Sequence, residues 1–254
     1  MADHPPADFA EVFEDQALPT IIGGQAVNLW AQYYSSKAPE LERFKPFTSR
    51  DGDLWANRET VIALRDRTGW KCQLYDEPRT HAVGILTKEI PGQKDPLKIE
   101  ILKDVHGLTE EDLAKSTEIA IDGRKPMKVL DAPVLLKGKI ATLHSFSSKD
   151  RPNDERHILL LIPITRCFLI ERVEAVRKGL VKERNLLAAV RYALEVGWSI
   201  PALELSTQYG FDFSAVMPAI DDFTGLPRLA KFIELELPRI APILDRGSIE
   251  PEID

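Results

Sequence analysis

Two aspartates, Asp51 and Asp53, constrain this chain more than any other feature, because they lie two residues apart in the short β-prone stretch of residues 47–55. On an extended strand, residues two apart point to the same face, so this stretch presents two carboxylates side by side. Carboxylates that close repel each other, and both stay ionised at neutral pH only beside a positive charge. Mg²⁺ suits such a pair because it takes hard oxygen ligands and completes its shell with waters and substrate phosphates.

A second interpretation of the same residues remains open at this point. Asp51-Gly52 is also a strong signal for a two-residue hairpin turn between two strands. In that case the two carboxylates lie in a turn rather than on one face of a strand. The residues before and after this stretch favour the strand.

A pair of glycines precedes the aspartates. Gly23 and Gly24 follow the β-prone run of residues 20–22, and the apolar residues between 26 and 33 recur with helical spacing. The pair therefore joins the end of a strand to the start of a helix. The backbone can approach a ligand closely there, and the free N–H groups and dipole of the helix favour phosphate. A tight turn without a ligand is the alternative.

Glu100 is a candidate third acid, since it is embedded in the apolar strand pattern of residues 97–102. A carboxylate in a buried strand is costly unless it is paired, hydrogen-bonded or bound to a cation. The alternative is an ordinary glutamate on the solvent face of an alternating strand, next to Lys98.

The rest of the chain predicts an α+β fold that changes character near residues 131–133. Before this point, patterns predict helices at 9–18 and 58–67 and strands at 70–75, 81–87, 118–121 and 127–130. After it, helical patterns dominate, at 134–146, 155–177 with a kink at Pro163, 181–196, 201–209 and 226–237. We therefore predict a domain of residues 1–132, with a mixed β-sheet flanked by helices, and an all-helical domain of residues 133–254.

Composition excludes several classes of function. The formal net charge of −7 argues against a broad basic surface for nucleic acid, so any RNA contact would be local. Cys72 and Cys167 lack metal-ligand spacing, which predicts buried, reduced thiols of a cytosolic protein rather than a zinc site. The first residues have no signal-peptide pattern, and the longest apolar run, residues 158–164, is too short to span a bilayer. We predict a cytoplasmic protein with no membrane contact.

The order of strand, Gly-Gly, helix, strand with Ser-x-Asp-x-Asp and later strand with a third acid resembles the nucleotidyltransferase superfamily related to DNA polymerase β. More narrowly, it is similar to the branch that contains the toxins of AbiE-type abortive-infection and toxin–antitoxin systems. The resemblance covers roughly residues 19–165. The segments that carry it are residues 23–27, 49–54 and 99–101, together with residues 135–143 and 151–158, which are similar to the Lys-containing helix and the Arg-x-x-Lys-Asp element of that branch.

The resemblance implies a role for each matching residue. Gly23 and Gly24 would hold the nucleotide phosphates with help from Ser49, and Lys139 would reach the triphosphate, oriented by Asp154. Lys137 on the same helix competes for that role. The residues implied as catalytic and as ligands of two Mg²⁺ ions are Asp51, Asp53 and Glu100.

The implied activity is Mg²⁺-dependent transfer of a nucleoside monophosphate from an NTP to an acceptor, with pyrophosphate leaving. The branch implies the 3′ end of tRNA or another RNA as acceptor, a toxic outcome and an antitoxin partner. A small hydroxylated cation, as in aminoglycoside nucleotidyltransferases, is a second acceptor class, and a non-catalytic nucleotide-binding or partner-binding protein is a third reading. Three departures from the family pattern are Gly52 in place of an aliphatic residue, the insertion of residues 35–46, and Glu100 in place of the commoner Asp.

Overall fold

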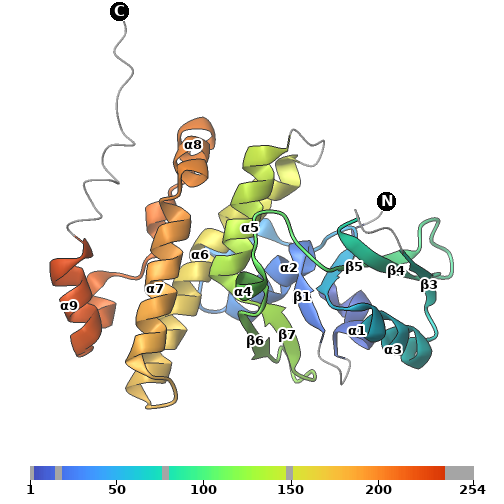
Figure 1. Ribbon diagram of the computed structural model, residues 1–254, viewed down its shortest axis with the longest axis horizontal. Helices are drawn as coiled ribbons and strands as arrows, with labels where there is room; N and C mark the ends of the chain where they lie inside the picture. Colours follow the sequence, from blue (N-terminus) through green and yellow to red (C-terminus); the bar gives the residue numbers. More distant parts are fainter. Residues whose placement is uncertain (1–2, 15–18, 76–79, 147–150, 238–254) are drawn as a thin grey trace, which may run out of the picture. The chain divides into compact units, whose positions relative to one another are not determined.

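In the computed structural model, residues 3–14, 19–75, 80–146 and 151–237 are described. Their contacts group the chain into two compact units, Met1–Ile164 and Thr165–Asp254. The first unit contains a mixed β-sheet with helices, and the second is helical (Figure 1). The predicted α+β class is confirmed.

Seven strands form one sheet within the described part of the first unit. In chain order they are β1 (Thr20–Ile22), β2 (Gly52–Trp55), β3 (Lys71–Leu74), β4 (Ala82–Lys88), β5 (Leu97–Leu102), β6 (Ser116–Ile119) and β7 (Met127–Leu130). Their spatial order is β3-β4-β5-β2-β1-β7-β6. Strand β2 runs antiparallel to β1 and parallel to β5, so it lies inside the sheet. Asp53 is therefore paired on both sides, with Ile22 and with Glu100.

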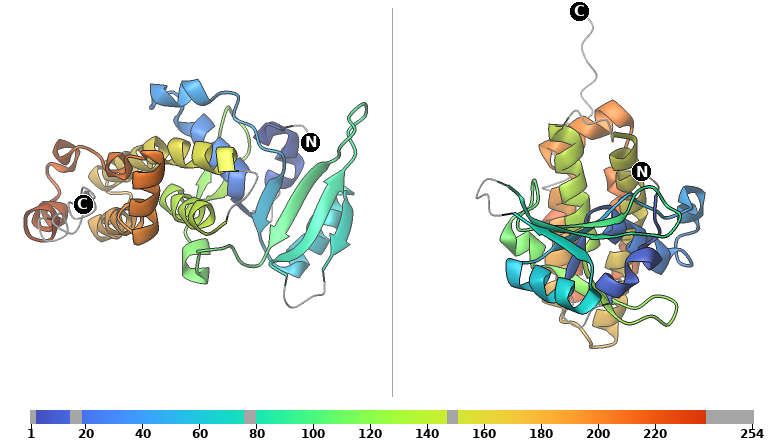
Figure 2. Two further views of the ribbon diagram at one scale, coloured as in Figure 1. Left: turned by 90° about the horizontal axis from the view of Figure 1, so that it is seen from above. Right: turned by 90° about the vertical axis from the view of Figure 1, so that its right-hand side faces the viewer.

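Two helices pack on different parts of the sheet. Helix α2 (Gly23–Tyr34) follows β1 directly, and the indole Nε1 of Trp30 donates to the carbonyl of Leu130 on β7 over 2.8 Å. Helix α3 (Arg58–Thr68) contacts β3 and β4, as Figures 1 and 2 also show. Asn57 caps its first turn through Thr60 N, and Gly69, with φ of 71°, ends it.

Shorter elements and two long helices complete the first unit. The short ones are η1 (Pro6–Phe9), α1 (Ala10–Phe13), η2 (Pro39–Phe44) and α4 (Glu110–Leu113). The insertion predicted at residues 35–46 thus contains η2. Helix α5 (Ala132–Ser145) contacts α2, and α6 (Arg151–Arg177) begins in the first unit and continues through Pro163 into the second.

The second unit contains α7 (Glu183–Gly197), α8 (Ile200–Tyr209), η3 (Phe213–Val216), η4 (Ile220–Phe223) and α9 (Pro227–Leu235). Within the described ranges, no single helix is long and apolar enough to cross a bilayer; only α7 and α8 taken together, with a bend of 55° between them, reach that length and composition. The cytoplasmic location stays a prediction. Residues 15–18 of the first predicted helix and Pro238, expected to end the last one, lie outside the described residues.

The change to helices alone occurs after β7, close to the predicted position. The compact units nevertheless divide later, between Ile164 and Thr165, because α5 and the start of α6 pack with the unit that holds the sheet. Whether residues 1–132 and 133–254 behave as separate domains stays a prediction.

The hairpin interpretation of Asp51-Gly52 is wrong. Gly52 begins β2, where it pairs with Ile99 of β5, and Asp53 pairs with Ile22 of β1. The structure also explains why glycine stands at position 52. A Cβ there would lie 3.1 Å from the ring of Phe13 and 3.3 Å from Ile99 Cγ1. Phe13, fully buried, fills the space that an aliphatic side chain at position 52 would need.

We expect Gly52→Val to lower the free energy of unfolding by about 1–3 kcal/mol, because the larger side chain overpacks this site. In a Phe13→Ala background the same substitution should cost less, since the space is then free. Urea unfolding of the wild type, both single variants and the double variant measures this coupling. Equal costs of Gly52→Val in the two backgrounds would contradict the proposed exchange of volume.

Candidate active site

One pocket of about 460 Å³ in the first unit collects most of the predicted site residues. Asp51 lies directly before β2 and Asp53 within it, and both line this pocket. Helix α5 supplies Lys139 and Thr142, and α6 supplies three further lining residues. The full lining is Asp3, Gly24, Thr48, Ser49, Arg50, Asp51, Asp53, Lys139, Thr142, Asn153, Asp154 and His157. We call this the carboxylate pocket.

The glycine pair is required by close packing against the site. Gly23 has a φ of +64°, and a Cβ on it would lie 1.9 Å from Asp53 Oδ2. A Cβ on Gly24 would lie 2.6 Å from Ser49 Oγ and 3.1 Å from the ring of His157. Any side chain at these positions would therefore displace the carboxylate or the hydroxyl. The two glycines that follow strand β1 thus lie against the carboxylate of Asp53 and the hydroxyl of Ser49.

The two aspartates are electrostatically unfavourable as a pair. Burial, followed by the charge of Asp51, raises the pKa of Asp53 to about 7. Burial also raises the pKa of Asp51, against the opposing charge of Lys98. Protein atoms surround the Asp53 carboxyl densely, although part of its surface remains open to the pocket. A site with two such carboxylates gains from a bound cation.

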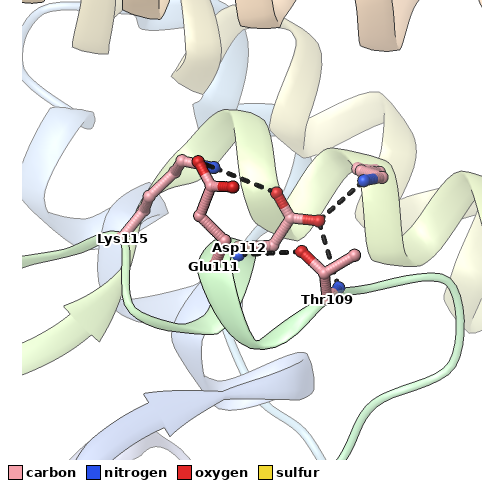
Figure 3. Close-up of polar contacts among 5 residues, drawn as sticks. Thr109, Glu111, Asp112 and Lys115 are labelled. Atoms are coloured by element: carbon pink, nitrogen blue, oxygen red, sulfur yellow. Dashed lines mark hydrogen bonds and ion pairs between the residues drawn. The ribbon is translucent and has the colours of Figure 1, made fainter.

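The structure distinguishes the two lysines of α5. Lys139 Nζ lies 3.0 Å from Asp154 Oδ1, and both residues line the carboxylate pocket. Lys137 Nζ instead donates to Oδ2 of Asp112 over 2.6 Å. Asp112 is buried and also accepts from Lys115 and from the backbone of Thr109, as Figure 3 shows. Lys137 is thus part of a structural ion pair outside the pocket lining, and Lys139 faces the pocket.

Glu100 is placed beside Asp53 but is otherwise engaged. The register of β2 and β5 pairs these two residues directly. Glu100 Oε1, however, accepts from Lys98 Nζ over 2.5 Å, and Glu100 does not line the carboxylate pocket. Burial lowers the pKa of Lys98, but the hydrogen bond to Glu100 and the nearby carboxylate charges outweigh it and raise this pKa. Lys98 is therefore protonated and pairs with Glu100, which agrees with the alternative of an ordinary glutamate beside Lys98.

The donor set fits one Mg²⁺ better than two. Across the described ranges, no group of three His, Cys, Asp or Glu side chains is arranged to hold a metal ion. Mg²⁺ is usually held by one or two carboxylates plus waters and substrate phosphates, which Asp51 and Asp53 can satisfy. A second ion would need Glu100 to leave Lys98. The predicted pair of Mg²⁺ ions stays a prediction.

His157 lines the pocket, although the sequence predicted no catalytic role for it and at most support for Lys139 and Asp154. It is only 6% exposed, it lines the carboxylate pocket, and its Nδ1 has no hydrogen-bond partner among the described residues. Burial, followed by the charge of Lys139, lowers its pKa well below the usual value of 6.5, so the ring is neutral. The signal was present in the spacing, because His157 lies three residues after Asp154 and shares its face of α6.

Two further pockets adjoin this one. The first, of about 170 Å³, shares Asp53, Lys139 and Thr142 and is otherwise mostly apolar. The second, of about 530 Å³, shares Asp3, Thr48 and Asn153. Its cationic lining residues are Arg43, Lys45 and Arg156. The carboxylate pocket thus shares lining residues with one mostly apolar pocket and with one that has three cationic residues in its lining.

Comparison with solved structures gives distant likenesses. No protein-family model matches the chain, and no curated protein matches it. A nucleotidyltransferase-like protein from Paracoccidioides brasiliensis is similar in structure, with 16% identity, a TM-score of 0.45 and coverage of 87% of this chain and 99% of that one. JHP933 from Helicobacter pylori is similar with 14% identity, a TM-score of 0.35 and coverage of 95% and 94%. Neither likeness assigns the chain to a family.

We predict that Asp53→Asn stabilises the metal-free protein at pH 8. The folded-state pKa of about 7 exceeds the unfolded value of about 3.9, so ionisation of Asp53 costs stability as pH rises between the two values. The full cost, at most about 4 kcal/mol, is present above pH 7 and largely absent below pH 4.

Urea unfolding in EDTA at pH 5 and pH 8 measures this difference. The advantage of Asp53→Asn should be larger at pH 8 than at pH 5, and Mg²⁺ should stabilise the wild type more than the variant. Asp66→Asn, at an exposed position, is the matched control and should change stability by less than about 0.5 kcal/mol. An advantage that does not grow with pH contradicts the prediction.

Lys137 and Lys139 provide a second matched pair of variants. Lys139→Met should weaken binding of Mg²⁺-ATP by at least about tenfold, because it removes a cation that faces the pocket beside Asp154. Lys137→Met should leave binding unchanged but lower the free energy of unfolding by roughly 1–3 kcal/mol, because buried Asp112 loses a partner. Isothermal titration calorimetry and urea unfolding check both. Weaker binding in Lys137→Met with intact binding in Lys139→Met would reverse the assignment.

Proposed function

We propose that this protein is a Mg²⁺-dependent nucleotidyltransferase that transfers a nucleoside monophosphate from an NTP to an acceptor hydroxyl. The observation that carries the proposal is that one pocket combines two carboxylates with a lysine, a serine hydroxyl and a helix start. Asp51 and Asp53 suit the metal, whereas Lys139, Ser49 and the start of α2 at Gly24 suit phosphate. A ligand that carries a cation and an anion together satisfies all of them.

The residues divide the work of binding and orientation. Asp51 and Asp53 would hold Mg²⁺ with waters and phosphate oxygens, and the bound ion would neutralise charge that develops at phosphorus. Lys139, oriented by Asp154, would offset the charge of the triphosphate. Gly24 permits Ser49 to lie against the helix start, where backbone N–H groups and the hydroxyl would bind a phosphate together.

The transfer itself is an in-line displacement. The acceptor oxygen bonds to the α-phosphorus, the bond from that phosphorus to the bridging oxygen breaks, and pyrophosphate leaves with the electron pair. The proton of the acceptor hydroxyl goes to a carboxylate, for which we propose Glu100, once it separates from Lys98. Glu100 is adjacent to Asp53 in the sheet register, which places a third carboxylate on the neighbouring strand.

For the acceptor we propose an RNA end, and the 3′ end of tRNA in particular. The adjoining pocket with Arg43, Lys45 and Arg156 supports this choice, because arginine and lysine contact nucleic-acid phosphates. Arg156 also fixes this wall, since its guanidinium donates to the carbonyls of Phe44 and Pro46. A toxin role and an antitoxin partner rest on the resemblance to the AbiE-type branch alone.

Two specific observations favour other candidates. The net charge of −7 favours a small hydroxylated cation as acceptor. The ion pair between Lys98 and Glu100 favours a protein that binds NTP without turnover, since the third acid is occupied.

Transfer of label from the four α-labelled NTPs to total RNA and to aminoglycosides distinguishes these candidates. Wild type with Mg²⁺ should label RNA, EDTA should abolish the label, and Asp51→Asn/Asp53→Asn should reduce it at least about a hundredfold. Asp66→Asn serves as the exposed control. Label on an aminoglycoside supports the small cation, NTP binding without transfer supports the non-catalytic protein, and absence of NTP binding overturns the proposal.

A further inference from the structure

Two polar residues on α2, Gln25 and Asn28, are fully buried next to the carboxylate pocket without lining it. Buried amides are costly unless their hydrogen bonds are made. Their partners form a chain of donors and acceptors that ends at Ser49. Which atom donates and which accepts at each step of this series is determined by two backbone carbonyls, those of His4 and Ser49.

The chain begins at a backbone bridge. His4 N donates to Ser49 O over 2.9 Å, and Ser49 N donates to His4 O over 3.0 Å. Both carbonyl oxygens also lie near Gln25 Nε2, at 2.9 Å for His4 and 3.3 Å for Ser49. Carbonyl oxygens only accept hydrogen bonds, so the amide nitrogen of Gln25 must face them. The Oε1 of Gln25 is then left to face Asn28.

This orientation fixes Asn28 in turn. Asn28 Nδ2 lies 3.4 Å from Gln25 Oε1 and 2.9 Å from Ser49 Oγ. The opposite amide orientation would place the oxygen of Asn28 against the oxygen of Gln25, which is repulsive. Asn28 therefore donates to Ser49 Oγ. Its own Oδ1 has no partner among the described residues, so no other contact holds the amide in this orientation.

A serine hydroxyl that already accepts from Asn28 must place its single hydrogen elsewhere. Ser49 lines the carboxylate pocket, and no acceptor for this hydrogen is found in the described part of the chain. A second buried polar group points to a ligand at the same place, since unpartnered His157 Nδ1 belongs to a ring only 3.1 Å from the Cβ position of Gly24.

We infer that Gln25 and Asn28 are positioning residues that make Ser49 an obligatory hydrogen-bond donor to a phosphate oxygen bound at the start of α2. The inference rests on the proposed function and assigns a specificity to it. A hydroxyl that accepts from Asn28 keeps one lone pair but directs its hydrogen away from Asn28, and this hydrogen suits an anion such as a phosphate oxygen. The phosphate end of the ligand, rather than a cationic acceptor, occupies this corner.

Binding of inorganic tripolyphosphate with Mg²⁺, measured by isothermal titration calorimetry, tests the inference without a nucleobase. Ser49→Ala should weaken binding about 10–100-fold, the usual range for a hydrogen bond to a charged group. Asn28→Ala should weaken it about 2–10-fold, because the hydroxyl becomes free to rotate. Asn28→Asp should weaken it more than Asn28→Ala, because a carboxylate takes the hydrogen of Ser49 for itself.

That order is the decisive readout. A merely structural role for Asn28 predicts the reverse, since aspartate keeps the shape of asparagine and alanine does not. If Asn28→Asp does not fold, Asn28→Ala in the Ser49→Ala background decides instead, and it should add no further loss. Asn57→Ala, which removes a helix cap elsewhere, controls for lost stability.

The outcomes separate this inference from the proposed function. Wild-type binding with the expected order supports both. Wild-type binding that Asn28 variants leave unchanged, or an additive loss in the double variant, overturns the positioning role and leaves the proposed function intact. Absence of tripolyphosphate and NTP binding in the folded wild type overturns both.

Discussion

The approach of Asp53 to Gly23 is the contact on which the rest of the site depends. A carboxylate oxygen lies where a Cβ would stand, so the end of β1 and the middle of β2 meet without a side chain between them. This contact places the first turn of α2 beside the carboxylates, and it puts Gly24, Ser49 and Asp53 in one corner. The raised pKa of Asp53 is the electrostatic consequence of that packing, because protein atoms replace the water that would stabilise the charge.

The local part of this arrangement was predictable from the sequence. The strand, the glycine pair and the helix follow one another directly in the chain, the two aspartates lie at the next strand, and these backbone preferences agree with the fold. Lys139 and Asp154 were placed by resemblance, and the structure brings them to the same pocket. Hydrophobic periodicity likewise located most strands and helices to within a few residues.

The parts that escaped prediction depend on non-local contacts. Gly52 departs from the aliphatic residue of the family pattern, and the sequence cannot show that Phe13 fills the space of that side chain. The sequence left Lys137 as a competitor of Lys139, whereas in the structure Lys137 donates to buried Asp112. The burial of His157 and the pairing of Glu100 with Lys98 also follow from tertiary packing. In each case the deciding partner lies on another element, or its effect depends on how deeply both groups are buried.

The residues that line the pocket extend along the chain from Asp3 to His157, and this determines when the site can form during synthesis. A nascent chain on the ribosome has both aspartates early but lacks the cationic and donor groups of α5 and α6 until most of the first unit has been synthesised. A fragment that stops at residue 132 would likewise retain the carboxylates and lose Lys139, Asp154 and His157. The complete site can therefore form only after α5 and the start of α6 have been synthesised.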